Sequence, residues 1–173
     1  DIFSKNKLFG VYKINDDILD LKEEKVLKEK FETFQKKSNL IVVSDYGHGF
    51  ITRKISEKIS NSKKFVALNA QINANNVGYH SLKNYKNINF VIINERELRH
   101  EFRDRNGNLK ILIKNFCKKQ KIQDLIVTRG SLGAILYNKS VNGFYHCPAF
   151  ADKVLDKVGS GDTMLTQSSM TLT

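Results

Sequence analysis

Short apolar runs alternate along this chain with segments whose apolar residues recur every three or four positions. This alternation is typical of a mostly parallel β-sheet whose strands are joined by crossover helices. Strands are predicted at 40–43, 65–69, 90–93, 124–128, 134–137 and 144–145. Helices are predicted at 22–38, around Ile51, Ile55 and Ile59, around Leu98 and Phe102, and at 109–120. The pattern therefore predicts one α/β unit without internal repeats or linkers.

The last two predicted strands are expected to form a hairpin. Asn142-Gly143 lies between the two apolar runs, and an Asn-Gly pair in that position favours a tight primed turn.

Length and composition indicate one globular domain. The chain has 173 residues, of which 40% are hydrophobic, which is enough for a substantial core in one domain and short for two. No apolar run approaches the roughly 20 residues that cross a bilayer, and the first residues lack the pattern of a secretory leader. Both ends read as the interior of a larger protein, so we expect truncation at each end and no membrane partner.

Cysteine content and charge add few constraints. Cys117 and Cys147 are far apart and neither belongs to a CxxC pair, so we expect no zinc site, no disulfide framework and a cytoplasmic location. The formal charge of +11 suits nucleotides, sugar phosphates or nucleic acid as partners. Because the lysines are scattered, without a basic block and interleaved aromatics, we expect no nucleic-acid partner, and a basic RNA-binding domain is kept only as an alternative.

The segment 154–164 carries the most chemical information. Gly159 and Gly161 flank one small residue, so the backbone can turn sharply and come close to a ligand. A predicted helix begins there, and its first-turn N–H groups, at the positive end of the helix dipole, form an anion site. Asp162 could cap this helix, or it could be a general base that takes a proton from an attacking hydroxyl beside a moving phosphoryl group.

Four motifs, in order along the chain, resemble those of the PfkB (ribokinase-like) carbohydrate kinases. Asp156-Lys157-Val158-Gly159-Ser160-Gly161-Asp162 closely resembles the family's C-terminal signature, Asp-x-x-Gly-x-Gly-Asp. Asn94-Glu95-Arg96-Glu97 resembles its Asn-x-x-Glu motif, and residues 127–133 resemble its Val-Thr-x-Gly-x-x-Gly turn. Residues 43–49, Val-Ser-Asp-Tyr-Gly-His-Gly, resemble a segment of the branch that includes the heptose-phosphate kinases of ADP-heptose synthesis.

The resemblance implies a fold and a domain. The fold would be ribokinase-like, a three-layer α/β/α arrangement truncated at both ends, with residues 1–173 as the C-terminal part of a single kinase domain. The N-terminal sugar-binding half with its lid, and the extreme C-terminus, would be missing. The resemblance leaves open a homodimer and a nucleotidyltransferase domain fused to the parent protein.

The resemblance also implies a role for each matched position. Asp162 would be the catalytic base, and the backbone of Gly159, Ser160 and Gly161 would form the anion hole. Asn94 and Glu97 would organise Mg²⁺, through water, and the phosphates of ATP. The remaining implied ligand contacts are Thr128 and Gly130 at the nucleotide, Asp156 at a monovalent cation, and Asp45 near the phosphate path.

Several of these positions have a structural alternative. Asn94 and Glu97 form a pattern like a capping box, and residues 128–130 could be an ordinary turn between strands. Arg129 could contact phosphate or be solvated, and His48 could be catalytic or an ordinary loop residue.

The chain departs from the family pattern at two places. Lys157 stands where a threonine is usual, which puts the monovalent-cation site in doubt. Asn69-Ala70-Gln71 stands where many members carry Asp-Pro. The amides of Asn69, Gln71, Asn73 and Asn76 could face the cleft or could simply form turns.

The implied activity is ATP-dependent phosphoryl transfer to a hydroxyl of a sugar or sugar phosphate, mainly by positioning and charge stabilisation. One alternative is a nucleoside or small-alcohol kinase on the same fold. Another is a nucleotide-binding module that is catalytically incomplete, and we expect this chain by itself to be inactive because half of the family's domain is absent.

Overall fold

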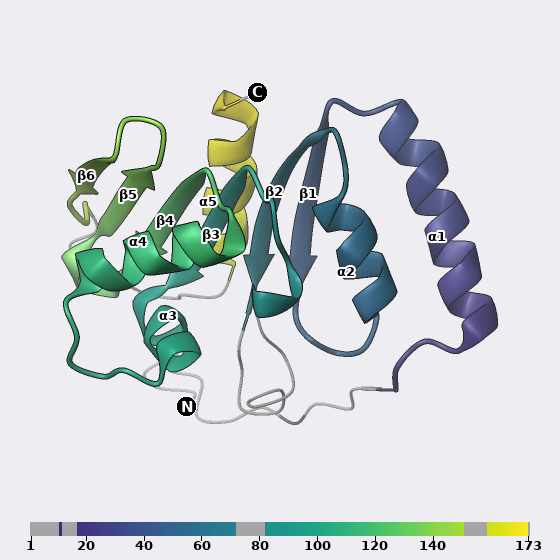
Figure 1. Cartoon of the computed structure of the whole chain (residues 1–173), viewed down its shortest axis with the longest axis horizontal. Coiled ribbons are helices and arrows are strands. Elements are labelled where there is room, and N and C mark those ends of the chain that lie inside the picture. The colour runs from purple at the N-terminus through teal and green to yellow at the C-terminus, as the bar shows by residue number, and fades with distance from the viewer. Residues whose placement is uncertain (1–10, 12–16, 72–81, 151–158, 173) are drawn as a thin grey trace, which may run out of the picture.

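A single six-stranded sheet forms the centre of the computed structural model, which describes residues 11, 17–71, 82–150 and 159–172. The strands lie in chain order: β1 (Leu40–Asp45), β2 (Phe65–Ala70), β3 (Phe90–Asn94), β4 (Asp124–Thr128), β5 (Ala134–Asn138) and β6 (Gly143–Cys147). β1 to β4 are parallel, whereas β5 and β6 pair antiparallel (Figure 1). Every predicted strand is present, so the predicted mostly parallel sheet is confirmed.

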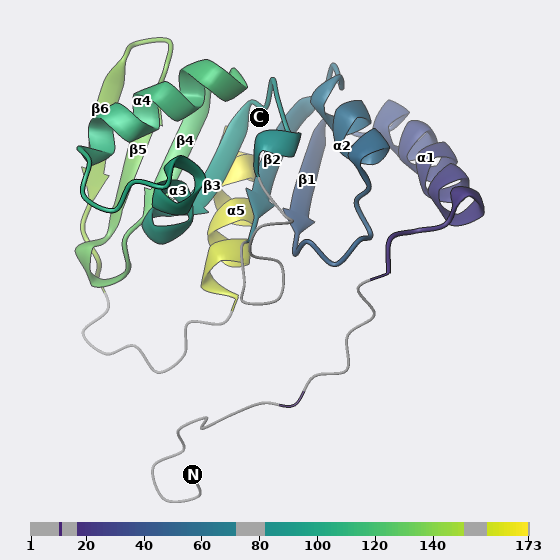
Figure 2. The ribbon, with the colours of Figure 1, turned by 60° about the horizontal axis from the view of Figure 1, so that its bottom comes forward.

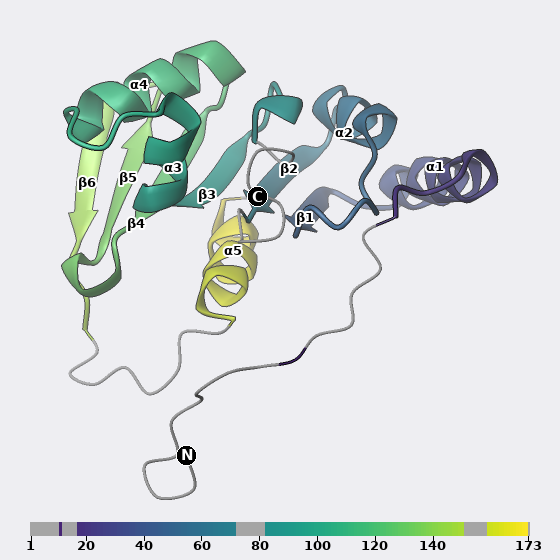
Figure 3. The same ribbon diagram turned by 90° about the horizontal axis from the view of Figure 1, so that it is seen from below.

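Helices cover the two faces of the sheet unequally. One face carries α2 (Arg53–Ser60), α3 (Glu95–Phe102) and α4 (Leu109–Gln120), and α1 (Leu21–Lys36) lies beyond β1 at the edge (Figure 2). On the opposite face, α5 (Ser160–Thr171) stands alone among the described helices (Figure 3). Short 3₁₀ turns occur at Leu82–Asn84 and Gly130–Leu132. Within the described residues, we find no helix both long and apolar enough to cross a membrane.

Side-chain caps mark the start of four of the five α-helices. The caps of α1 to α4 are Asp20, Thr52, Asn94 and Asn108, whose side chains accept backbone N–H groups of the first turn. Such caps satisfy donors that have no partner inside the helix. α5 differs, because its N-cap residue is Gly159 and no side chain caps it.

Alternation along the strands divides the core into two clusters, because successive side chains point to opposite faces of a sheet. The larger cluster lies under α2, α3 and α4, and includes Leu68, Val91 and Phe116. The smaller one lies under α5 and includes Ala67, Phe90, Ile92 and Leu165. This second cluster seats α5 on the sheet.

α1 is attached by charged contacts and partial burial. None of its residues is fully buried, and only Leu27 and Phe31 pack against the larger cluster. Glu24 pairs with Lys54 of α2 at 3.0 Å, and Glu32 pairs with Lys58 one turn further along α2.

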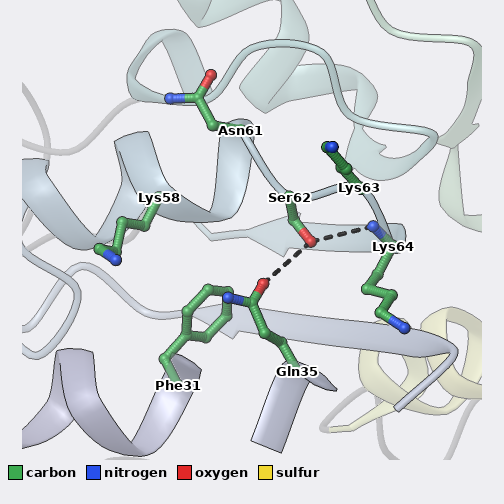
Figure 4. Close-up of a pocket in the computed structure, with 7 residues that line it drawn as sticks. All are labelled: Phe31, Gln35, Lys58, Asn61, Ser62, Lys63 and Lys64. Atoms are coloured by element: carbon green, nitrogen blue, oxygen red, sulfur yellow. Dashed lines mark hydrogen bonds between the residues drawn. The ribbon is translucent and has the colours of Figure 1, made fainter. Parts of the chain in front are cut away.

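A pocket of about 350 Å³ lies between α1 and the turn that leads into β2. Its lining residues are Phe31, Gln35, Lys58, Asn61, Ser62, Lys63 and Lys64 (Figure 4). The three lysine amino groups point in different directions in this view, and Lys58 is already paired with Glu32. The pocket also lies at the amino end of β2, so it is separate from the carboxyl edge of the sheet.

The turn between β5 and β6 differs from the predicted one. The hairpin is present, but Asn138 pairs with Gly143, so residues 139–142 form the loop. A primed Asn-Gly turn needs positive φ at both residues, whereas here Asn142 has a φ of 50° and Gly143 has no positive φ. The side chain of Asn138 accepts a hydrogen bond from Val141 N at 3.1 Å, which favours the longer loop.

Two glycines of the turn between β4 and β5 have positive φ, 60° at Gly130 and 79° at Gly133. A Cβ on Gly133 would collide with the carbonyl oxygen of Cys147, whereas a Cβ on Gly130 would meet nothing within 4 Å. Gly133 is therefore required for the close approach of β6 to the start of β5.

We expect Gly133→Ala to lower the free energy of unfolding much more than Gly130→Ala. Both variants place a side chain in the left-handed region, at a cost of about 1–2 kcal/mol. Only Gly133→Ala adds a collision with backbone atoms, which should cost about 1–3 kcal/mol more. Urea unfolding measures both values, and equal losses would contradict the close packing at Gly133.

Candidate functional site

The carboxyl ends of the four parallel strands bring polar residues to one edge of the sheet. Ser44 is paired with Asn69 in the β1–β2 register, and Asn94 with Thr128 in the β3–β4 register. The amino end of α5 lies at the same edge, because α5 runs opposite to β1 and β2 (Figure 1). In parallel α/β sheets this is the edge at which ligands bind.

Asp162 is bound to the segment at the end of β1 through both oxygens of its carboxylate. Its Oδ1 accepts a hydrogen bond from the Ser44 hydroxyl, and its Oδ2 accepts one from the Tyr46 phenol, each at 2.8 Å. Asp162 is the third residue of α5, so these bonds fix the first turn of the helix against the end of β1. The carboxylate does not cap its own helix, which begins at Gly159 without a side-chain cap.

The phenol of Tyr46 is a stable neutral donor to this carboxylate. The pKa of Tyr46 is raised above its ordinary value, mainly because the phenol donates a hydrogen bond to Asp162 and further because it is partly buried. Tyr46 thus keeps its proton, and its bond to Asp162, throughout the neutral pH range.

The turn that leads into α5 has open space beside Gly159, whereas Gly161 packs closely against β2. Gly159 has a φ of 77°, and a Cβ there would meet nothing within 4 Å. A Cβ on Gly161 would lie 3.2 Å from Nδ2 of Asn69, so the helix passes close to β2. Thr163 N donates to Gly159 O at 2.9 Å, so the backbone N–H groups of Ser160, Gly161 and Asp162 precede this bond in the first turn. Such groups point out of the end of a helix and can bind an anion.

Asn94 and Glu97 form a complete capping box at the start of α3. Asn94 Oδ1 accepts from Arg96 N, and Glu97 Oε2 accepts from Asn94 N, both at 2.9 Å. The capping alternative for this motif is therefore present in the structure. Among the residues described, no group of three His, Cys, Asp or Glu side chains could hold a metal ion. Mg²⁺ would accordingly fit here through water and phosphate oxygens, with at most one or two carboxylate contacts.

An ion-pair network connects two of the predicted motifs. Glu95 of the Asn-x-x-Glu motif binds Arg129 at 2.7 Å and Arg99 at 2.9 Å. Burial alone would raise the pKa of Glu95, but the hydrogen bonds and positive charges of Arg129 and Arg99 outweigh it, and the pKa is lowered. Arg129 is therefore engaged by a carboxylate, which neither sequence alternative anticipated.

Thr128 and Gly130 stand on either side of Arg129 at the end of β4. Thr128 is half-buried and lies next to Asn94, whereas Gly130 is exposed and has open space beside it. The turn is closed by a hydrogen bond from Arg129 N to Gly133 O at 2.8 Å. This geometry is thus compatible both with an ordinary turn between strands and with a turn that lines a ligand-binding site.

Asp45 faces away from Asp162 although its sequence neighbours bind that residue. It is 6% exposed, and its carboxylate accepts hydrogen bonds from Gly47 N at 2.9 Å and from the Tyr85 phenol. Burial and the charge of Asp45 raise the pKa of Tyr85 far above its ordinary value. This placement does not support the predicted contact of Asp45 with the phosphate path, because the carboxylate instead orders the loop after β1.

Asp156, Lys157, Asn73 and Asn76 lie outside the described residues, so the cation contact of Asp156 stays a prediction. Ser44 and Tyr46 were not predicted as partners of Asp162. The available signal was their position in the segment 43–49, which already resembled a family motif.

Solved structures with the same architecture include two kinds of sugar kinase. Phosphofructokinase-2 from Escherichia coli, in complex with potassium, matches with a TM-score of 0.73 and 18% identity over 90% of this chain and 50% of its own. Ribokinase from Arabidopsis thaliana, complexed with ribose and ATP, matches with a TM-score of 0.57 and 14% identity over 79% of this chain and 43% of its own. At these identities the similarity establishes the ribokinase-like fold alone.

Sequence comparison identifies the family. The bifunctional protein HldE from Aliarcobacter butzleri is 23% identical over 161 residues, which are 91% of this chain and 32% of HldE. The chain therefore spans about a third of this relative and half of phosphofructokinase-2. The family model described as pfkB family carbohydrate kinase matches residues 14–166, and on that match the chain belongs to the pfkB family of carbohydrate kinases.

Proposed function

We propose that the protein to which this chain belongs transfers the γ-phosphoryl group of ATP to a hydroxyl of a sugar or sugar phosphate, with Asp162 as general base. The observation that supports this proposal most directly is the position of the Asp162 carboxylate. Two hydroxyl groups donate hydrogen bonds to it where the amino end of α5 meets the carboxyl edge of the sheet. Membership of a carbohydrate kinase family supports the reaction class. Residues 1–173 would form the C-terminal part of the kinase domain.

Asp162 can act as a base because its contacts leave acceptor capacity. Each of its oxygens accepts one hydrogen bond from a described side chain, and an ionised carboxylate offers about four acceptor positions. A substrate hydroxyl can therefore bind beside Ser44 and Tyr46 without displacing them. As the hydroxyl oxygen bonds to the γ-phosphorus, its proton passes to Asp162, and the bond from the γ-phosphorus to the bridging oxygen of ADP breaks.

The turn before Asp162 would provide the anion hole. Backbone N–H groups of Gly159, Ser160 and Gly161 would stabilise charge on the transferred phosphoryl group, and the open space beside Gly159 supports access for it. Because these donors are part of the backbone at the start of α5, they need no rearrangement when the charge develops.

The nucleotide would lie along the neighbouring strands, against Thr128 and Gly130. Mg²⁺, when bound, would neutralise charge on the phosphates, and Asn94 and Glu97 would orient it through water. Asp156 would belong to a monovalent-cation site. The resemblance of residues 43–49 to the heptose-phosphate kinase branch favours a sugar phosphate as the acceptor.

We expect Asp162→Asn in the full-length protein to lower kcat by about 10²–10⁴-fold, because an amide cannot take the proton. The Kd of ATP should stay close to that of the wild type, since the contacts along β4 are untouched. A coupled ADP-release assay gives kcat, and titration calorimetry gives Kd.

Asp20→Asn is the matched control, because it makes the same change of charge at the cap of α1, where asparagine also caps well. A wild-type kcat for Asp162→Asn would refute the assignment of the base. ATP binding without turnover in the wild-type protein would indicate a binding module.

Tyr46→Phe and Ser44→Ala should each lower kcat by about 2- to 10-fold, because each variant removes one hydrogen bond that orients the Asp162 carboxylate. The KM for ATP should change little. Tyr145→Phe is the control, since Tyr145 is an exposed tyrosine of β6, away from α5. An unchanged kcat in both variants would show that these hydroxyls do not position the base.

A further inference from the structure

Tyr85 is a buried tyrosine whose phenol donates a hydrogen bond to the carboxylate of Asp45. Tyr85 is 2% exposed and belongs to the larger apolar cluster, and Asp45 is 6% exposed. Burial and the charge of Asp45 raise the pKa of Tyr85 far above its ordinary value, so the phenol stays a protonated donor at neutral pH. Such a pair gives little net stability, because burial removes the carboxylate from water. Stability alone therefore does not account for the pair.

Asp45 lies between the two residues that bind Asp162. The hydroxyls of Ser44 and Tyr46 donate to Asp162 on the face of the sheet that carries α5, each at 2.8 Å. Asp45 points to the opposite face, because successive side chains of a strand alternate. The end of β1 is therefore held from both faces, by Asp162 on one and by Tyr85 on the other.

The same aspartate fixes the turn that follows β1. Oδ1 of Asp45 accepts a hydrogen bond from Gly47 N at 2.9 Å, and Gly47 has a φ of 70°. The carbonyl oxygen of Asp45 accepts another from Gln71 N at 2.9 Å, which joins the turn to the end of β2. Because Tyr46 lies between Asp45 and Gly47, a shift of Asp45 moves the phenol of Tyr46 as well.

Tyr85 is itself held by its neighbours in the chain. The backbone N–H of Leu82 donates to Oε1 of Glu101 in α3 at 3.1 Å. The backbone N–H of Lys86 donates to Oγ of Ser60 in α2 at 3.0 Å. The segment that carries Tyr85 is thus fixed to two helices, and its phenol is a fixed point for the carboxylate that it binds.

We propose that Tyr85 is a positioning residue for the general base and acts through Asp45 on the loop that binds Asp162. The bond from the Tyr85 phenol sets the position of Asp45 and of the backbone on either side of it. That backbone places the hydroxyls of Ser44 and Tyr46 against the carboxylate of Asp162. The assignment of Asp162 as the base rests on the proposed function.

The test replaces Tyr85 by phenylalanine in the full-length protein, which keeps the ring in the core and removes only the hydroxyl. We expect Tyr85→Phe to lower kcat by about 2- to 10-fold, the effect of losing one orienting hydrogen bond. The Kd of ATP should stay at the wild-type value, because Thr128 and Gly130 are untouched.

Coupling to Ser44 and Tyr46 separates this role from a general loss of stability. In the Ser44→Ala/Tyr46→Phe background, the hydroxyls through which Tyr85 acts are already absent, so Tyr85→Phe should lower kcat little further. A residue that only stabilises the fold would have the same relative effect in both backgrounds. Equal losses in the two backgrounds would therefore overturn the proposal.

Tyr137→Phe is the matched control, because Tyr137 is also buried and its phenol also donates to a side-chain oxygen, Oδ1 of Asn142 at 3.1 Å. This bond lies at the hairpin loop between β5 and β6, at the edge of the sheet opposite to the site. The variant should lower the urea midpoint and leave kcat unchanged. A fall in kcat as large as that of Tyr85→Phe would assign both effects to stability and overturn the positioning role.

A second variant covers the case in which Tyr85→Phe folds poorly. Asp45→Asn/Tyr85→Phe removes the buried charge together with the hydroxyl and keeps an oxygen that can accept from Gly47 N. It should fold and should again have a lower kcat. A crystal structure of either variant should show the Tyr46 phenol beyond hydrogen-bonding distance of Asp162.

The outcomes distinguish this inference from the proposed function. An active wild-type protein with an unchanged kcat in Tyr85→Phe would overturn the role of Tyr85 and leave the kinase proposal standing. A wild-type protein that phosphorylates no sugar or sugar phosphate would remove the kinase function. The crystal structure then decides for Tyr85, since an unchanged contact of 2.8 Å between Tyr46 and Asp162 would overturn its positioning role.

Discussion

The position of α5 depends on the hydrogen bonds that join Asp162 to Ser44 and Tyr46, residues 118 and 116 positions away in the chain. Leu165 and Met164 pack on the smaller apolar cluster and hold the helix on the sheet. Apolar packing alone does not fix the rotation and height of a helix to a fraction of an ångström, because it has no direction. The two directed bonds place the carboxylate at the end of β1 and with it the glycine turn that precedes it.

A second set of polar contacts fixes the neighbouring part of the same edge. The capping box of Asn94 and Glu97 sets the start of α3, and Glu95 connects that helix to the turn after β4 through Arg129. Both regions lie at the carboxyl edge of the sheet, one after β1 and the other after β3 and β4, and Asn69 of β2 lies between them. Hydrogen bonds and ion pairs thus fix both parts of this edge, as a preorganised binding site requires.

Much of the fold and part of the site could be predicted from local sequence. The spacing of apolar residues predicted the strands and the helices, because the buried face of a strand repeats every two residues and that of a helix every three or four. The predicted type of hairpin turn was wrong. The side chain of Asn138 accepts a hydrogen bond from Val141 N, and this bond competes with the tight turn that Asn142-Gly143 favours. The contact of Asp45 with the phosphate path stays a prediction, and the carboxylate of Asp45 accepts a hydrogen bond from Tyr85 on the other face of the sheet.

The sequence by itself determined which segments become strands and helices, where a glycine turn enters a helix and which carboxylate follows it, because these depend on neighbours in the chain. Only the tertiary structure decided which groups meet: Ser44 and Tyr46 with Asp162, Arg129 with Glu95, and Asn69 with the first turn of α5. The physical reason is that hydrogen bonds and ion pairs act over about 3 Å. Their partners lie tens of residues apart, and strand order and register must be known before any such pair can be assigned.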